Sequence, residues 1–90
     1  MGHVASNPRK LLGRVRRMGG QIAALETLLQ GPPECADVLV RIAAIRGAAH
    51  GLMMKVLADH LRSHVAEERN PERRQSEAAA VAVLMRTYLK

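Results

Sequence analysis

Apolar residues recur along the first third of the chain at alternating spacings of four and three, as in a helix that packs along one seam. They are Leu11, Val15, Met18, Ile22, Leu25 and Leu29. Asn7 followed by Pro8 is a good helix start. Gly31, Pro32 and Pro33 end the pattern. The sequence therefore predicts a first helix over about residues 8–30.

The same spacing continues beyond the prolines and predicts a second helix over about residues 34–65. Its apolar positions are Cys35, Val38, Ile42, Ile45, Ala49, Leu52 and Val56. Such a helix is roughly 45 Å long, too long for a compact monomer of this size. Asn70 and Pro71 begin a third helix over about residues 71–89. We predict one all-α domain over residues 1–90, with residues 1–7 as a flexible arm and no strands.

The composition indicates an obligate oligomer. Of the 90 residues, 48% are apolar, yet Tyr88 is the one aromatic residue, so a single chain has little bulk with which to fill its own core. Burial between subunits best explains the surplus. Gly47 and Gly51 make the middle of the second helix slim, so we expect helices to cross closely at a subunit interface.

The charge balance predicts a polyanionic partner. The net charge is +6 and the pI is about 10.8. Charge runs usually form solvated helix faces, but no acidic residue precedes Glu26 here, which favours phosphate binding. The scarcity of aromatic residues argues against single-stranded nucleic acid. The predicted contacts to double-stranded DNA are Arg9, Lys10, Arg14, Arg16, Arg17 and Arg46.

The lone cysteine, Cys35, excludes a disulfide within the chain. We find no signal-peptide pattern and no apolar run of membrane-spanning length, so we expect a cytoplasmic protein with no membrane contact. No nucleophile and base are paired in a way that predicts an enzyme.

His60 and His64 lie one helical turn apart and could bind one metal ion together. Cys35 precedes His60 by twenty-five residues, about 37 Å along a straight helix, so it would have to come from a second, antiparallel chain. A free cysteine on a helix seam is more often a small buried hydrophobe. A coherent set of soft and borderline metal ligands nevertheless results when His3, near the amino terminus, is added to Cys35, His60 and His64.

Four segments resemble the RcnR and FrmR branch of the CsoR family of bacterial transcriptional repressors. They are RVRRMGGQ at 14–21, ECADVL at 34–39, RIAAIRGAAHGLMMKVLADHLRSH at 41–64 and the closing YLK. The resemblance covers nearly the whole chain. It implies a three-helix subunit in an antiparallel dimer, with two dimers forming a disc-shaped homotetramer that binds operator DNA.

Within this family the effector follows the donor set. Copper sensors carry Cys, His and Cys at the positions of Cys35, His60 and His64, whereas nickel and cobalt sensors of the RcnR type carry His, Cys, His and His. The latter is the pattern of His3, Cys35, His60 and His64. A thiolate with several nitrogens suits Ni(II) and Co(II), and Zn(II) would bind too. We expect the metal-free protein to bind its operator, and nickel or cobalt to release it and derepress efflux or resistance genes.

Two alternatives stay open. Sensors of the FrmR type crosslink formaldehyde between the thiol at position 35 and an amino-terminal proline amine; this chain carries Gly2 there, and His64 where that branch tends to have an acid. A primary amine on Gly2 could still react, with Cys35 as the second nucleophile. The other alternative is a constitutive architectural or metal-storage protein. Two further positions depart from the family pattern. This chain has Gly19 where relatives usually carry Lys or Arg, and His50 where they usually carry Asn.

Overall fold

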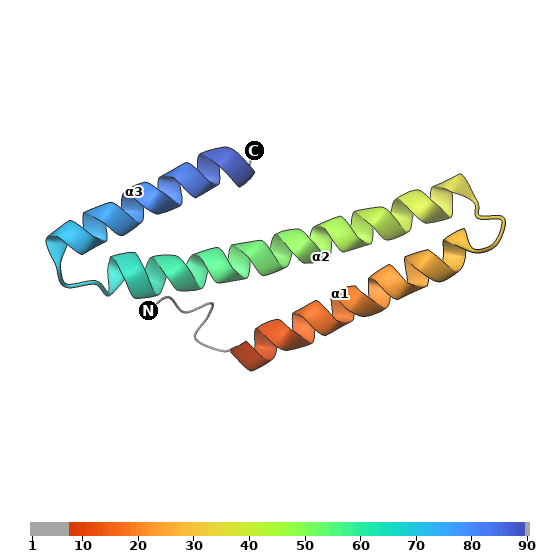
Figure 1. Ribbon diagram of the computed structural model, residues 1–90, viewed down its shortest axis with the longest axis horizontal. Coiled ribbons are helices and arrows are strands. Elements are labelled where there is room, and N and C mark those ends of the chain that lie inside the picture. Colours follow the sequence, from red (N-terminus) through yellow and green to blue (C-terminus); the bar gives the residue numbers. More distant parts are fainter. Residues whose placement is uncertain (1–7, 90) are drawn as a thin grey trace. The chain divides into compact units, whose positions relative to one another are not determined.

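The computed structural model describes residues 8–89. They form α1 (Pro8–Leu29), α2 (Cys35–Leu61), a π-helical turn η1 (Arg62–Ala66) and α3 (Pro71–Tyr88), and these described residues contain no strand (Figure 1). The predicted all-α fold of three helices is therefore confirmed. The second helix differs from the prediction at its end, because the α-helical geometry stops at Leu61 and a π turn follows.

Local sequence signals account for the helix starts. Pro8 and Pro71 each occupy the first position of a helix, where the missing N–H has no partner to lose. Asn70 caps α3: its side-chain Oδ1 accepts hydrogen bonds from the backbone N–H groups of Glu72, at 2.9 Å, and Arg73, at 3.1 Å. This cap fixes the start of α3 directly after residues 67–70, the polar segment that joins α3 to the π turn.

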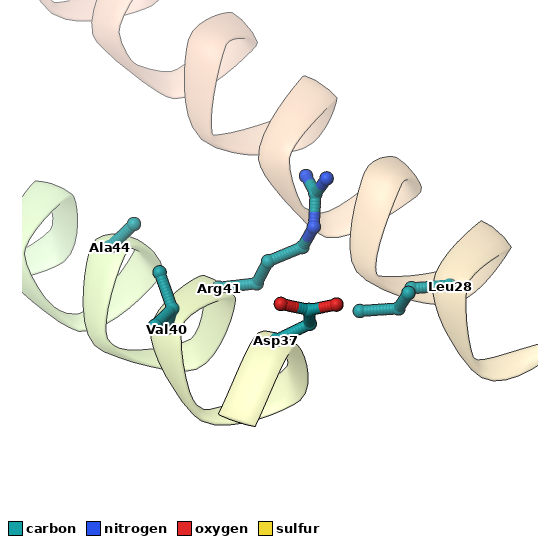
Figure 2. A pocket seen from close by; sticks show the side chains of 5 residues that line it. All are labelled: Leu28, Asp37, Val40, Arg41 and Ala44. Atoms are coloured by element: carbon teal, nitrogen blue, oxygen red, sulfur yellow. The ribbon is translucent and has the colours of Figure 1, made fainter. Parts of the chain in front are cut away.

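The chain divides into two compact units, residues 8–55 and 56–89, with the boundary inside α2. In the first unit, α1 and the beginning of α2 run antiparallel. Leu28, near the end of α1, faces the start of α2 across an open hollow of about 400 Å³ lined also by Asp37, Val40, Arg41 and Ala44 (Figure 2). Nearer the start of α1, the Arg14 guanidinium lies beside Gly51 of α2.

The second unit comprises the end of α2, the π turn and α3, which packs against the π turn. The Glu67 backbone N–H donates to the Arg62 carbonyl at 2.9 Å, the wider ring that defines the π turn. Val81 is 2% exposed, and Asp59, at 3%, accepts a 2.8 Å hydrogen bond from Arg62 Nη2. A charged pair therefore lies at the turn between α2 and α3.

Large apolar side chains remain on the surface of the chain. Among residues 8–89, Leu11 and Val81 are the buried apolar residues, whereas Leu39 is 60% exposed, Val40 68% and Tyr88 67%. This distribution agrees with burial between subunits, and the oligomeric state stays a prediction. Within the described part of the chain, every helix is too short or too polar to cross a lipid bilayer.

Candidate metal centre and DNA-binding surface

The structure brings together the two histidines that the sequence placed one turn apart. His60 belongs to the last turn of α2 and His64 to the π turn. Their ring centroids lie 4.5 Å apart and the ring planes are tilted by 32°. Both residues are partly exposed. Two imidazoles in this arrangement are near enough for small side-chain movements to direct them to one ligand.

Glu77 of α3 fixes the orientation of one of these rings. His60 Nε2 lies 3.2 Å from Glu77 Oε2, and because a carboxylate can only accept, the ring nitrogen donates. A neutral His60 then carries its lone pair on Nδ1. Histidines that bind metals usually donate their other ring N–H to a carboxylate or carbonyl in this way. The Glu77 contact thus leaves His60 Nδ1 as the nitrogen available to an ion.

The other predicted ligands do not join this pair. Cys35 is the first residue of α2 and is exposed. His3, and Gly2 of the alternative aldehyde site, lie outside the described residues. Within residues 8–89, no three His, Cys, Asp or Glu side chains are close enough together to hold a metal ion. A complete metal site therefore needs donors beyond those that the described part of one chain brings together.

The sequence pattern did not single out Glu77. Glu77 follows His60 by seventeen positions, across the turn between α2 and α3, and no spacing rule links residues on two different helices. Its contact depends on how α3 packs against the end of α2, which periodicity does not reveal. An acid on the third helix, the element that returns beside the histidines, was the only available signal.

The predicted DNA-binding residues form an exposed basic surface on α1. All five cations of this helix are exposed, and its first turn contains no acid. At about 100° per residue, Lys10, Arg14 and Arg17 lie along one face, and Arg9 and Arg16 lie along a second. Arg46 of α2 is also exposed. The space that a side chain at Gly19 would occupy is open.

The described residues thus combine an exposed basic helix, as in proteins that bind nucleic acid, with a pair of neighbouring histidines. A comparison with protein families matches residues 7–88 to the metal-sensitive transcriptional repressor family. The chain belongs to this family, which includes the CsoR, RcnR and FrmR proteins. Its members are transcriptional repressors and not enzymes, as the sequence predicted, and repressors bind operator DNA.

Relatives and a solved structure agree with this assignment. The chain is 43% identical to an uncharacterized protein in the bioA 5′ region of Serratia marcescens and 38% identical to the transcriptional repressor RcnR of Salmonella typhimurium, each match covering both chains completely. A glutamate-to-histidine variant of the formaldehyde-responsive regulator FrmR from Salmonella enterica serovar Typhimurium is 39% identical, with a TM-score of 0.82 over 97% of this chain and 99% of the other.

Proposed function

We propose that this protein is a repressor released from operator DNA by Ni(II) or Co(II). The observation that carries the proposal is the histidine pair whose first member donates Nε2–H to Glu77 and so presents Nδ1 to a ligand. Such support by a carboxylate is typical of metal-binding histidines. The pair belongs to a member of a metal-sensitive repressor family, in which a bound ion would have a regulatory role.

The proposed ligands are His3, Cys35, His60 and His64. One thiolate with three imidazoles is a borderline donor set, which suits nickel and cobalt, whereas sets with more thiolates favour Cu(I). Zinc binds such a set as well, so selectivity depends on coordination geometry and on metal supply. Cys35 begins α2 and His60 is its penultimate residue. We therefore propose that one chain supplies Cys35 to a site and another chain supplies His60 and His64.

The proposed DNA contacts are the cations on the two basic faces of α1, together with Arg46. They would neutralise backbone phosphates, and sequence preference would come partly from DNA shape. Each phosphate contact makes the affinity more salt-dependent, because bound counterions are released. Among residues 8–89 we find no helix-turn-helix reader, and the exposed arginines of α1 are the groups proposed to lie along the duplex.

The oligomer that we propose is an antiparallel dimer that pairs into a tetramer. The exposed Leu39, Val40 and Tyr88 provide apolar surface for these contacts. Such an assembly would supply Cys35 of one chain to the histidines of another. It would also place several basic α1 helices on one particle, which raises the number of phosphates that one DNA segment can contact at once.

The link between the two sites is the short segment between His3 and the basic helix. His3 stands six residues before Arg9 in the sequence. Ligation by His3 would hold this segment near the metal site and so change the direction in which the α1 cations are presented to DNA. By thermodynamic reciprocity, DNA must weaken metal binding by the same factor, typically about 1–3 kcal/mol in free energy.

A formaldehyde-responsive repressor is the second candidate. The exposed Cys35 thiol and the similarity to a formaldehyde-responsive regulator favour it. In this reaction the amine of Gly2, if Met1 is removed, and the thiol would both bond to the formaldehyde carbon, and water would leave. The product is a methylene bridge between nitrogen and sulfur, which intact-protein mass spectrometry detects.

One titration separates the candidates. Reduced, metal-free protein is bound to a fluorescent duplex from the promoter region of its own gene, and fluorescence anisotropy follows release by nickel, cobalt, zinc or formaldehyde. We expect release by nickel or cobalt. Release by formaldehyde alone would replace the metal proposal with the aldehyde one, and retention with every effector would indicate an architectural protein.

A further inference from the structure

One of the proposed DNA-binding side chains lies against the neighbouring helix. A Cβ atom built on Gly51 of α2 would lie 3.5 Å from Nη1 of Arg14, an ordinary van der Waals contact. The other described glycines have open space at the same position. Gly51 is therefore the one glycine, among those of residues 8–89, beside which a long side chain rests.

The position of Arg14 on α1 explains this contact. At about 100° per residue, Arg14 lies roughly 60° from Leu11, at the border of the apolar seam. Its aliphatic part can follow the seam while the guanidinium reaches α2. Arg9 and Arg16 lie roughly 150° from Leu11, on the side of α1 away from the seam. Of these three arginines, Arg14 is thus the one placed to reach the second helix.

We propose that Gly51 is a positioning residue for Arg14. Without a side chain at position 51, the guanidinium has room beside the backbone of α2, and from there it contacts a DNA phosphate. A long side chain that is already held in place loses less conformational freedom when it binds. This inference rests on the proposed role of Arg14 in DNA binding and adds a second-helix residue that touches no DNA.

The distance also predicts which substitutions matter. Alanine adds only the Cβ, which would just touch the guanidinium. Valine adds two γ carbons whose χ1 angle is nearly fixed in a helix, so one of them must compete for the place of the guanidinium. Because the displaced group is the end of a flexible side chain, the fold can adjust while the direction of Arg14 changes.

Gly47 provides a matched control, one turn earlier on the same face of α2 and with open space around it. We expect Gly51→Val to bind the promoter duplex about threefold to tenfold more weakly, as for the loss of one pre-ordered long side chain. Gly51→Ala should bind as the wild type does, and Gly47→Val should do so as long as size-exclusion chromatography shows the wild-type assembly. The dependence of affinity on salt should also weaken in Gly51→Val, approaching that of Arg14→Ala.

A double-mutant cycle in metal-free protein tests the inference, with size-exclusion chromatography and thermal unfolding reporting on assembly and folding. Gly51→Val should have no further effect in the Arg14→Ala background. An equal loss in that background, a loss with Gly47→Val in a protein of unchanged assembly, or normal binding by Gly51→Val would overturn it. If Gly51→Val does not fold, Gly51→Ser is used in the same cycle. If Arg14→Ala binds normally, the DNA contact itself is wrong; if only the valine effect is missing, the positioning role alone fails.

Discussion

Replacing Glu77 by alanine tests whether the carboxylate beside His60 supports metal binding. The change removes the 3.2 Å hydrogen bond from His60 Nε2 and leaves the ring free to rotate and to carry its proton on either nitrogen. Loss of such a supporting carboxylate typically lowers metal affinity about 10-fold to 100-fold. Because the side chains of His60 and Glu77 are 30% and 38% exposed, water can partly replace the bond. We therefore expect the lower limit, about tenfold or 1.4 kcal/mol.

Nickel affinity is measured by competition with a chromophoric chelator, at fixed pH and salt. Glu72→Ala is the matched control: the residue lies on the same helix, and its contribution to the Asn70 cap is a backbone N–H that the substitution keeps. Glu77→Gln keeps an acceptor but removes the charge, so its affinity should fall between the wild type and alanine. DNA binding by the metal-free protein should not change. Equal nickel affinity of Glu77→Ala and wild type would refute the proposed supporting role of Glu77.

Three further substitutions test the proposed ligand Cys35, the cap of α3 and the charged pair at the turn between α2 and α3. Cys35→Ala should keep its affinity for the promoter duplex and lose release by nickel; nickel-dependent release in this variant, seen by anisotropy, would remove Cys35 from the site. Asn70→Ala should lower the free energy of unfolding by about 1 kcal/mol and Asn70→Asp should not, because only the former loses the side-chain cap; equal melting temperatures at one protein concentration would contradict this. Asp59→Ala should lower the free energy of unfolding by about 0.5–1.5 kcal/mol, the usual net contribution of one hydrogen bond, because the Arg62 side chain that it leaves behind is 49% exposed and can be hydrated. An unchanged denaturant midpoint would show that the pair contributes nothing.

The sequence was sufficient to predict the helices, because their boundaries depend on local chemistry. Proline at the first position and an asparagine cap define the start of α3, and the apolar spacing of four and three identifies the body of α1. The π turn after Leu61 was not predictable in this way. No glycine or proline marks it, and its wider hydrogen-bonded ring becomes apparent only where α3 packs against it.

The candidate sites, too, were predictable only where a contact depends on local spacing along the chain. The i, i+4 spacing predicted that His60 and His64 would be neighbours, as their rings are. The spacing could not predict that Glu77 supports one of them, or that the Arg14 guanidinium rests beside Gly51, because both contacts join different helices. The Gly47 and Gly51 pair predicted a close helix crossing between subunits; within the chain, Gly51 instead accommodates an arginine, and the crossing stays a prediction.

Each proposed metal site draws Cys35 and the histidines from two different chains. Chains carrying Cys35→Ala and chains carrying His60→Ala are unfolded together, refolded as a mixture and bound to the promoter duplex, and nickel is added. Neither variant alone has a complete site, but a mixed dimer contains one in which both residues are intact. We predict that nickel releases DNA from the mixture and from neither variant alone. If the mixture stays bound while the wild type is released, the shared site is contradicted.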